Sequence, residues 1–113
     1  MSAPTPLSWP ALIHHLGDAE LEYIADDSAW QTWGASPGAA RLIDSHGIAY
    51  AITPDRRLNL LNHMTLEEIL ILIRAHAAQE GICCTSKIGA ISIPAAINLL
   101  SSLSVEPGCN QAI

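Results

Sequence analysis

Hydrophobic and polar positions alternate with a period of two along the first half of the chain, a pattern typical of half-buried β-strands. The run 20–25 alternates in this way, and Gly17-Asp18 separates it from the apolar run 11–16. Two such runs around a glycine-containing turn predict a β-hairpin. The segments 41–44 and 48–53 flank another turn, at Ser45-His46-Gly47, and predict a second hairpin.

Two shorter elements lie between and after these hairpins. Asp26-Asp27-Ser28 offers an N-cap for a short helix that carries Trp30 and Trp33. The segment Leu58-Asn59-Leu60-Leu61 is a candidate fifth strand. The sequence therefore predicts an antiparallel sheet of four to five strands.

The second half of the chain changes to a helical period. Thr65 and Glu68 have the spacing of a capping box, in which each side chain bonds the other residue's open backbone N–H, and they predict a helix over 65–80. A further apolar stripe predicts a last helix over 92–103. Residues 82–91, between the two helices, are compatible with a strand or a loop.

Strands that come first and helices that come last indicate an α+β fold, with the two C-terminal helices packed on one face of the antiparallel sheet. The length of 113 residues is that of one domain. We expect this domain to span residues 9–105, with a flexible N-terminus over 1–8 and a tail over 106–113.

The composition and net charge of the chain argue against several classes of function. Hydrophobic residues make up 50% of the chain, the net charge is −6, and there are only five lysines and arginines, which argues against binding to nucleic acid. No apolar stretch reaches the ~20 residues of a membrane helix, so we expect no membrane association. The three cysteines form no evenly spaced disulfide framework, which predicts a cytoplasmic protein.

The adjacent pair Cys83-Cys84 is the first candidate for chemistry. The pair follows the end of a predicted helix, where the partial negative charge of the helix disfavours a thiolate. One interpretation places one cysteine in the core and the other near the surface. The alternative is a thiol-dependent enzyme or redox sensor that uses Cys84 or Cys83 with His76.

The remaining polar residues have structural explanations. His14 and His15 are neighbours on a predicted strand, so their side chains point to opposite faces and do not share a metal ion. Asp44 is placed as a turn former, and Glu67-Glu68 lies in a first helical turn, where negative charge is favourable. We therefore assign no catalytic residue, no metal ligand and no cofactor.

Two features favour contact with another molecule. Trp30 and Trp33 are three residues apart and share one side of a short helix, and tryptophan is enriched in binding hot spots. Alternatively, the two rings seal the sheet edge, because a chain without phenylalanine has few large residues. Ile71 lies opposite the main apolar stripe of its helix, which indicates either burial on both sides or an interface. These residues predict a non-enzymatic binding or protein-interaction module whose partner is a protein or a second copy of the chain.

Several blocks of turns and apolar runs form a recognisable set: Trp9-Pro10-Ala11, Gly17-Asp18-x-Glu20-Leu21, Leu42-Ile43-Asp44-Ser45-x-Gly47, Glu68 to His76, and Cys84-x-x-Lys87-Ile88. Together they resemble a small bacterial family known only as a domain of unknown function. The resemblance covers the chain from Trp9 to Leu103. It implies a compact α+β domain with no established activity, so no catalytic residue is carried over.

Overall fold

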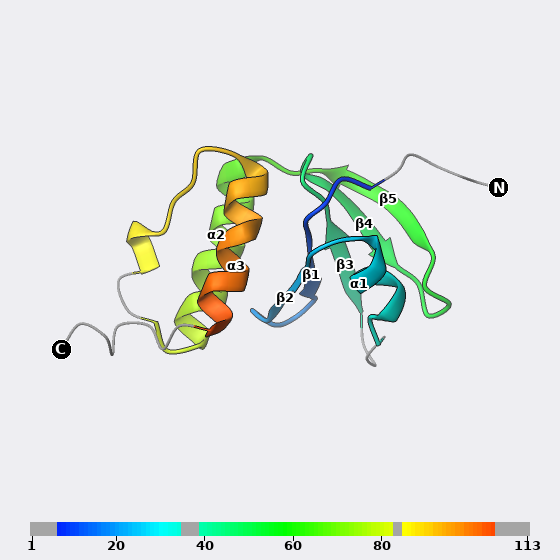
Figure 1. Cartoon of the computed structure of the whole chain (residues 1–113), viewed down its shortest axis with the longest axis horizontal. Coiled ribbons are helices and arrows are strands. Elements are labelled where there is room, and N and C mark those ends of the chain that lie inside the picture. Colours follow the sequence, from blue (N-terminus) through cyan, green and yellow to red (C-terminus); the bar gives the residue numbers. More distant parts are fainter. Residues whose placement is uncertain (1–6, 35–38, 83–84, 106–113) are drawn as a thin grey trace.

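Five strands form one antiparallel sheet in the computed structural model, which describes residues 7–34, 39–82 and 85–105 (Figure 1). The strands are β1 (Ala11–His15), β2 (Leu21–Ile24), β3 (Ala40–Ile43), β4 (Ile48–Ile52) and β5 (Leu58–His63). Their order across the sheet is β2-β1-β3-β4-β5, so β2 and β5 are the two edges. The predicted α+β class and antiparallel sheet are confirmed, with five strands.

The pairing of neighbouring strands confirms both predicted hairpins. Strand β1 pairs with β2, and β3 pairs with β4. The pairing of β4 with β5 contains one irregularity: Ala49 lies opposite Asn62, while the next residue, Tyr50, lies opposite Leu60. Leu61 is therefore an extra residue in β5, the arrangement of a β-bulge.

In the described residues, three α-helices accompany the sheet: α1 (Asp27–Thr32), α2 (Leu66–Gln79) and α3 (Ile93–Val105). The capping box at the start of α2 is present, because the Thr65 hydroxyl accepts from the Glu68 N–H and the Glu68 carboxylate accepts from the Thr65 N–H. Gly81 follows the helix with a φ of +88°, a left-handed conformation that glycine adopts without strain.

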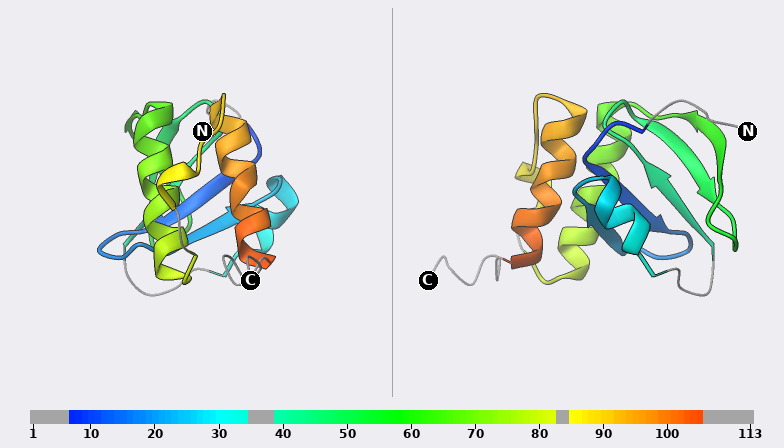
Figure 2. Two further views of the ribbon diagram at one scale, coloured as in Figure 1. Left: turned by 90° about the vertical axis from the view of Figure 1, so that its left-hand side faces the viewer. Right: turned by 45° about the vertical axis from the view of Figure 1, so that its right-hand side comes forward.

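Helices α2 and α3 lie side by side and begin at the same end of the molecule (Figures 1 and 2). The chain after α2 must therefore return along the helices before α3 starts. Within this return the short 3₁₀ helix η1 (Thr85–Lys87) is formed, and the Arg74 Nε donates to the Ile88 carbonyl at 2.9 Å. No strand occurs in the described part of 82–91, where the sequence left strand and loop open.

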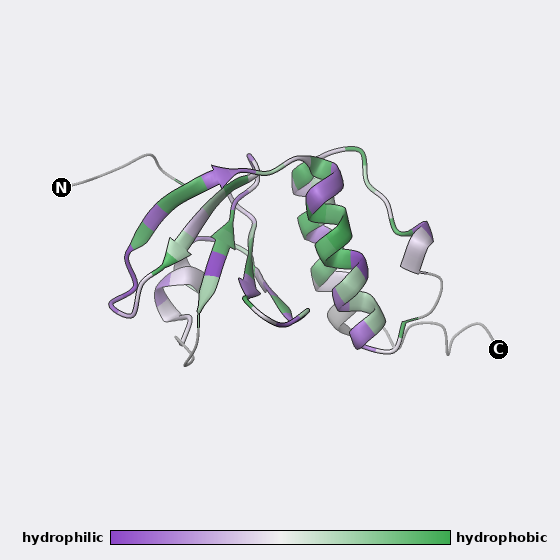
Figure 3. Ribbon diagram, turned by 180° about the vertical axis from the view of Figure 1, so that it is seen from behind, coloured by the Kyte–Doolittle hydropathy of each residue, from purple (hydrophilic) through white to green (hydrophobic). Residues whose placement is uncertain are grey.

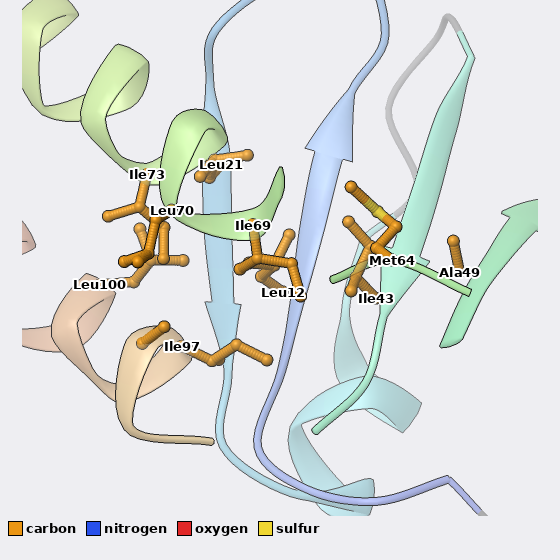
Figure 4. Close-up of a cluster of buried hydrophobic side chains, with 11 residues drawn as sticks. Leu12, Leu21, Ile43, Ala49, Met64, Ile69, Leu70, Ile73, Ile97 and Leu100 are labelled. Carbon is orange, nitrogen blue, oxygen red and sulfur yellow. The ribbon is translucent and has the colours of Figure 1, made fainter. Parts of the chain in front are cut away.

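The first hydrophobic cluster joins α2 and α3 to the sheet (Figure 4). Its buried members are Leu12, Leu21, Ile43, Ala49, Met64, Ile69, Leu70, Ile73, Ala96, Ile97 and Leu100. Burial of this many aliphatic side chains, each contributing about 1.5–3 kcal/mol, is the main term that holds the helices on the strands.

The second cluster uses the alternate residues of the same strands. It contains Ile13 and Leu42, whereas the neighbouring Leu12 and Ile43 belong to the first cluster. Since successive strand residues point to opposite faces, the two clusters lie on opposite sides of the sheet. Helix α1 contributes Trp30 to the second cluster and stands in front of the sheet in Figure 2.

Gly47, in the turn between β3 and β4, lies where the starts of both long helices meet the sheet. Its φ is +82°, and its carbonyl accepts from the Met64 N–H at 2.7 Å. A Cβ at this position would lie 2.5 Å from the Met64 carbonyl oxygen and 2.9 Å from the Ile93 Cδ1. The close approach thus requires a residue without a side chain.

Candidate functional site

The two tryptophans of α1 are held within the molecule. Asp26 caps the helix by accepting from the Ala29 N–H at 2.9 Å, and the rings of Trp30 and Trp33 stack with their centroids 5.6 Å apart. They are only 7% and 8% exposed, respectively. Burial of this depth favours the alternative to an interface, and leaves little area for a partner. The rings belong to the second buried cluster, whereas the sequence analysis placed them at the sheet edge.

Arg56 contacts both tryptophans. The sequence analysis placed this residue in a turn and assigned it no further role. Its guanidinium lies 5.0 Å from the Trp30 ring centroid, a cation–π distance. It also donates to the carbonyls of Trp30 and Trp33 at the end of α1. A cation there satisfies carbonyls that a helix end leaves open and complements the helix dipole.

Glu22 links the second tryptophan to the sheet. Its carboxylate accepts from the Trp33 Nε1 at 3.1 Å and from the His15 Nε2 at 2.6 Å. This carboxylate therefore cross-links β1, β2 and the end of α1.

His14 lies on the other face of the sheet from His15, as the sequence predicts. Its Nδ1 accepts from the Arg41 Nε at 3.1 Å, and its Nε2 donates to the Asp18 carbonyl at 3.1 Å. This pattern is that of a neutral imidazole, and burial lowers the pKa of His14 below its ordinary value of 6.5. Within the described residues no three His, Cys, Asp or Glu side chains gather closely enough to hold a metal ion.

His76 connects α2 to β2 and is only 7% exposed. Its Nδ1 accepts a hydrogen bond from the Leu21 N–H at 3.1 Å. Cys83 and Cys84, the proposed thiol partners of His76, lie outside the described residues. The thiol alternative therefore stays a prediction.

Asp44 is a buried turn former, as the sequence predicts, and is 1% exposed. Its carboxylate accepts from the backbone N–H groups of His46 at 2.9 Å and Ile48 at 3.1 Å. The Ser8 hydroxyl lies 3.0 Å from the His46 Nδ1. However, the carboxylate holds the backbone of His46 and not its ring, so these residues do not form the relay of a Ser-His-Asp triad.

Ile71 lies on the outer face of α2 and is 56% exposed. The buried residues of this helix occupy the opposite side, and both Ala75 and Ala78 are exposed next to Ile71 in the i+4 and i+7 positions. Figure 3 shows this helix from the side away from α3, with hydrophobic segments between hydrophilic bands. We call Ile71, Ala75 and Ala78 the outer α2 face.

Large apolar side chains are also exposed on the edge strand β5. Leu60 is 71% exposed and Leu61 is 50% exposed. The sequence analysis predicted this strand over Leu58 to Leu61 but made no prediction of how exposed its leucines are. The other large hydrophobic residues that are exposed in the described ranges are Leu16 and Ile91.

These observations define a class: a small α+β protein whose described polar groups stabilise the fold and whose surface carries exposed apolar positions on α2 and β5. No helix in the described ranges is long and apolar enough to cross a membrane.

The chain belongs to the DUF4144 family, described as a protein structure with unknown function, which it matches over residues 9–100. A solved structure, titled as the NMR structure of the protein from Shewanella amazonensis, is similar with 33% identity and a TM-score of 0.70. The similarity covers 91% of this chain and 98% of that one. None of the curated proteins compared with the chain matches it. The resemblance to a bacterial domain of unknown function is thus confirmed.

Proposed function

We propose that this protein is a non-enzymatic interaction module that binds another protein or a second copy of itself. The observation that carries the proposal is the outer α2 face, where Ile71 is 56% exposed on a helix whose opposite side is already buried. Apolar side chains at i, i+4 and i+7 form a continuous strip, the arrangement by which one helix packs on another element.

The polar groups of the described residues support a binding role over catalysis. The carboxylates of Glu22 and Asp44 and the ring of His76 are engaged in bonds that hold strands, turns and helices together. A catalytic group needs to face a substrate with a suitably tuned pKa, whereas these groups bond backbone N–H groups or the side chains of Trp33 and His15. The net charge of −6 favours a protein partner over nucleic acid, and the odd number of cysteines favours the cytoplasm.

The test uses Ile71→Glu, with Ser102→Glu as its control. Both sites are exposed helix positions, so both variants should fold, and each adds one negative charge. Wild type and both variants are compared by sedimentation velocity and by affinity capture from cells that naturally make the protein.

We expect an association, with a captured protein or with a second copy, that persists in Ser102→Glu and is lost in Ile71→Glu while the thermal unfolding midpoint is unchanged. An identical solution mass and an identical set of captured proteins for all three chains would discard the proposal.

A further inference from the structure

Strand β5 is an edge strand with exposed side chains and no charged residue or proline. It is the outermost strand of the sheet in Figures 1 and 2, and its last five residues are exposed. Natural edges are commonly protected by short strands, charged side chains, proline, a β-bulge or a covering element, and of these β5 has the bulge described above. The sequence of β5, Leu-Asn-Leu-Leu-Asn-His, contains no Lys, Arg, Asp, Glu or Pro.

The opposite edge shows what protection looks like in the same molecule. Strand β2 has only four residues and includes Glu22. Its side chains are covered, since Leu21 belongs to the first cluster under α2 and α3 and Ile24 to the second cluster with α1. Among the described residues, β5 is thus the edge strand whose side chains are the more exposed.

The residue order of β5 is self-complementary. The central four residues, Asn59-Leu60-Leu61-Asn62, read the same in both directions. In an antiparallel pair of two β5 strands centred between the leucines, Leu60 meets the other copy's Leu61 and Asn59 meets the other copy's Asn62. Apolar side chains then face apolar side chains, and amides face amides.

The bulge makes this register possible. In a regular strand, residues three apart point to opposite faces, so Asn59 and Asn62 could not be direct partners across a two-fold axis. Here Asn59 lies opposite Ala51 and Asn62 opposite Ala49, and these alanines, two residues apart on β4, share one face. The extra residue Leu61 thus puts both asparagines on the same face of the sheet.

Charge also favours a second copy as the occupant. Two chains of net charge −6 repel each other at most surfaces, but the β5 edge brings no ionised carboxylate or ammonium of one strand opposite the other. Resting on the proposed interaction function, we infer that two copies pair antiparallel along β5 about a two-fold axis, which joins the two sheets into one continuous sheet.

The inference is tested by sedimentation velocity of the full chain between 10 μM and about 1 mM, concentrations that span the weak end of specific association. The single variants Leu60→Lys and Leu61→Glu each place one charge against a leucine of the other copy, and we expect each to raise the dimer dissociation constant at least tenfold. In the double variant Leu60→Lys/Leu61→Glu, each new ammonium faces a new carboxylate across the axis. The increase in the logarithm of the dimer dissociation constant should therefore be at most half of that in the single variants.

The control is Leu60→Lys/Ser102→Glu, which makes the same change in net charge but places its two charges on different elements. It should show no recovery. Because Leu60 is 71% exposed and Leu61 50% exposed, circular dichroism should show all variants folded.

A wild-type chain that stays monomeric at 1 mM, or a double variant no better than the singles, would overturn pairing along β5. A monomer that instead binds a synthetic peptide of alternating valine and threonine would assign the edge to a foreign strand and also overturn the second-copy inference. Pairing along β5 is expected to be lost in the Leu60 and Leu61 variants and kept in Ile71→Glu, whereas association through the outer α2 face is expected to show the reverse pattern. Failure here is therefore distinguishable from failure of the proposed function.

Discussion

Replacement of Gly47 by alanine probes the junction that positions both long helices against the sheet. Two costs add at this residue. A φ of +82° is unfavourable for an L-residue by about 1–2 kcal/mol. The new Cβ would also lie 2.5 Å from the Met64 carbonyl oxygen, a backbone atom that cannot rotate away. Overpacking of this kind costs about 1–3 kcal/mol.

The expected loss in the free energy of unfolding is therefore about 2–5 kcal/mol, a large part of the about 5–15 kcal/mol typical of a domain. Gly17→Ala is the matched control, because Gly17 has a similar φ of +87° and nothing within 4 Å of the new Cβ. It should lose only the backbone part, about 1–2 kcal/mol.

Urea denaturation followed by circular dichroism measures both variants, and the slope with denaturant should stay that of the wild type. The difference between the two losses isolates the close approach to Met64 and Ile93. If the two variants lose the same free energy within about 0.5 kcal/mol, a typical limit of additivity, the junction at Gly47 does not constrain the fold as described.

Three further changes test other parts of the fold. Trp30→Ala should cost about 3–5 kcal/mol by urea denaturation, because it removes a buried ring from the second cluster, whereas a loss below about 1 kcal/mol would show that the ring is not core. Thr65→Ala should cost about 1 kcal/mol through loss of the capping box, while Thr65→Ser should retain most of it. Burial lowers the pKa of His14 in the folded chain. As the pH falls below 6.5, the unfolded chain therefore binds more protons at this residue than the folded chain does. The stability that the neutral ring contributes is complete above pH 6.5 and is lost as the pH falls through the lowered pKa of the folded chain. Unfolding measured from pH 5 to 8 should then depend less on pH in His14→Gln than in the wild type, and equal dependence would contradict this assignment.

Elements with local signals were predictable from the sequence. The capping box of Thr65 and Glu68 and the N-cap at Asp26 each involve residues three positions apart, and both are present. Alternation likewise predicted the hairpins, because the pattern and the turn lie within one short stretch. The elements that these local patterns predict are present in the folded chain because the tertiary contacts favour the same local structure.

The contacts that position the site residues were not predictable, because they join residues far apart in the sequence. The Leu21 N–H bonds the His76 ring across 55 positions, and the Arg56 guanidinium bonds the Trp30 carbonyl across 26. The sequence analysis left Trp30 and Trp33 either as interface residues or as rings that seal the sheet edge. Their burial results from contacts with the strands and, for Trp30, with Arg56, which no local pattern indicates. Conversely, the exposure of Leu60 depends on β5 being the last strand of the sheet, which no local pattern records.

Photo-crosslinking in cells that naturally make the protein tests the interaction function most directly. A photoreactive amino acid is placed at position 71 on the outer α2 face or, as a control, at the exposed position 102 on α3. The account predicts a discrete adduct of defined mass from position 71 and none of that mass from position 102. The absence of a discrete adduct at 71, or the same adducts from both positions, would contradict it.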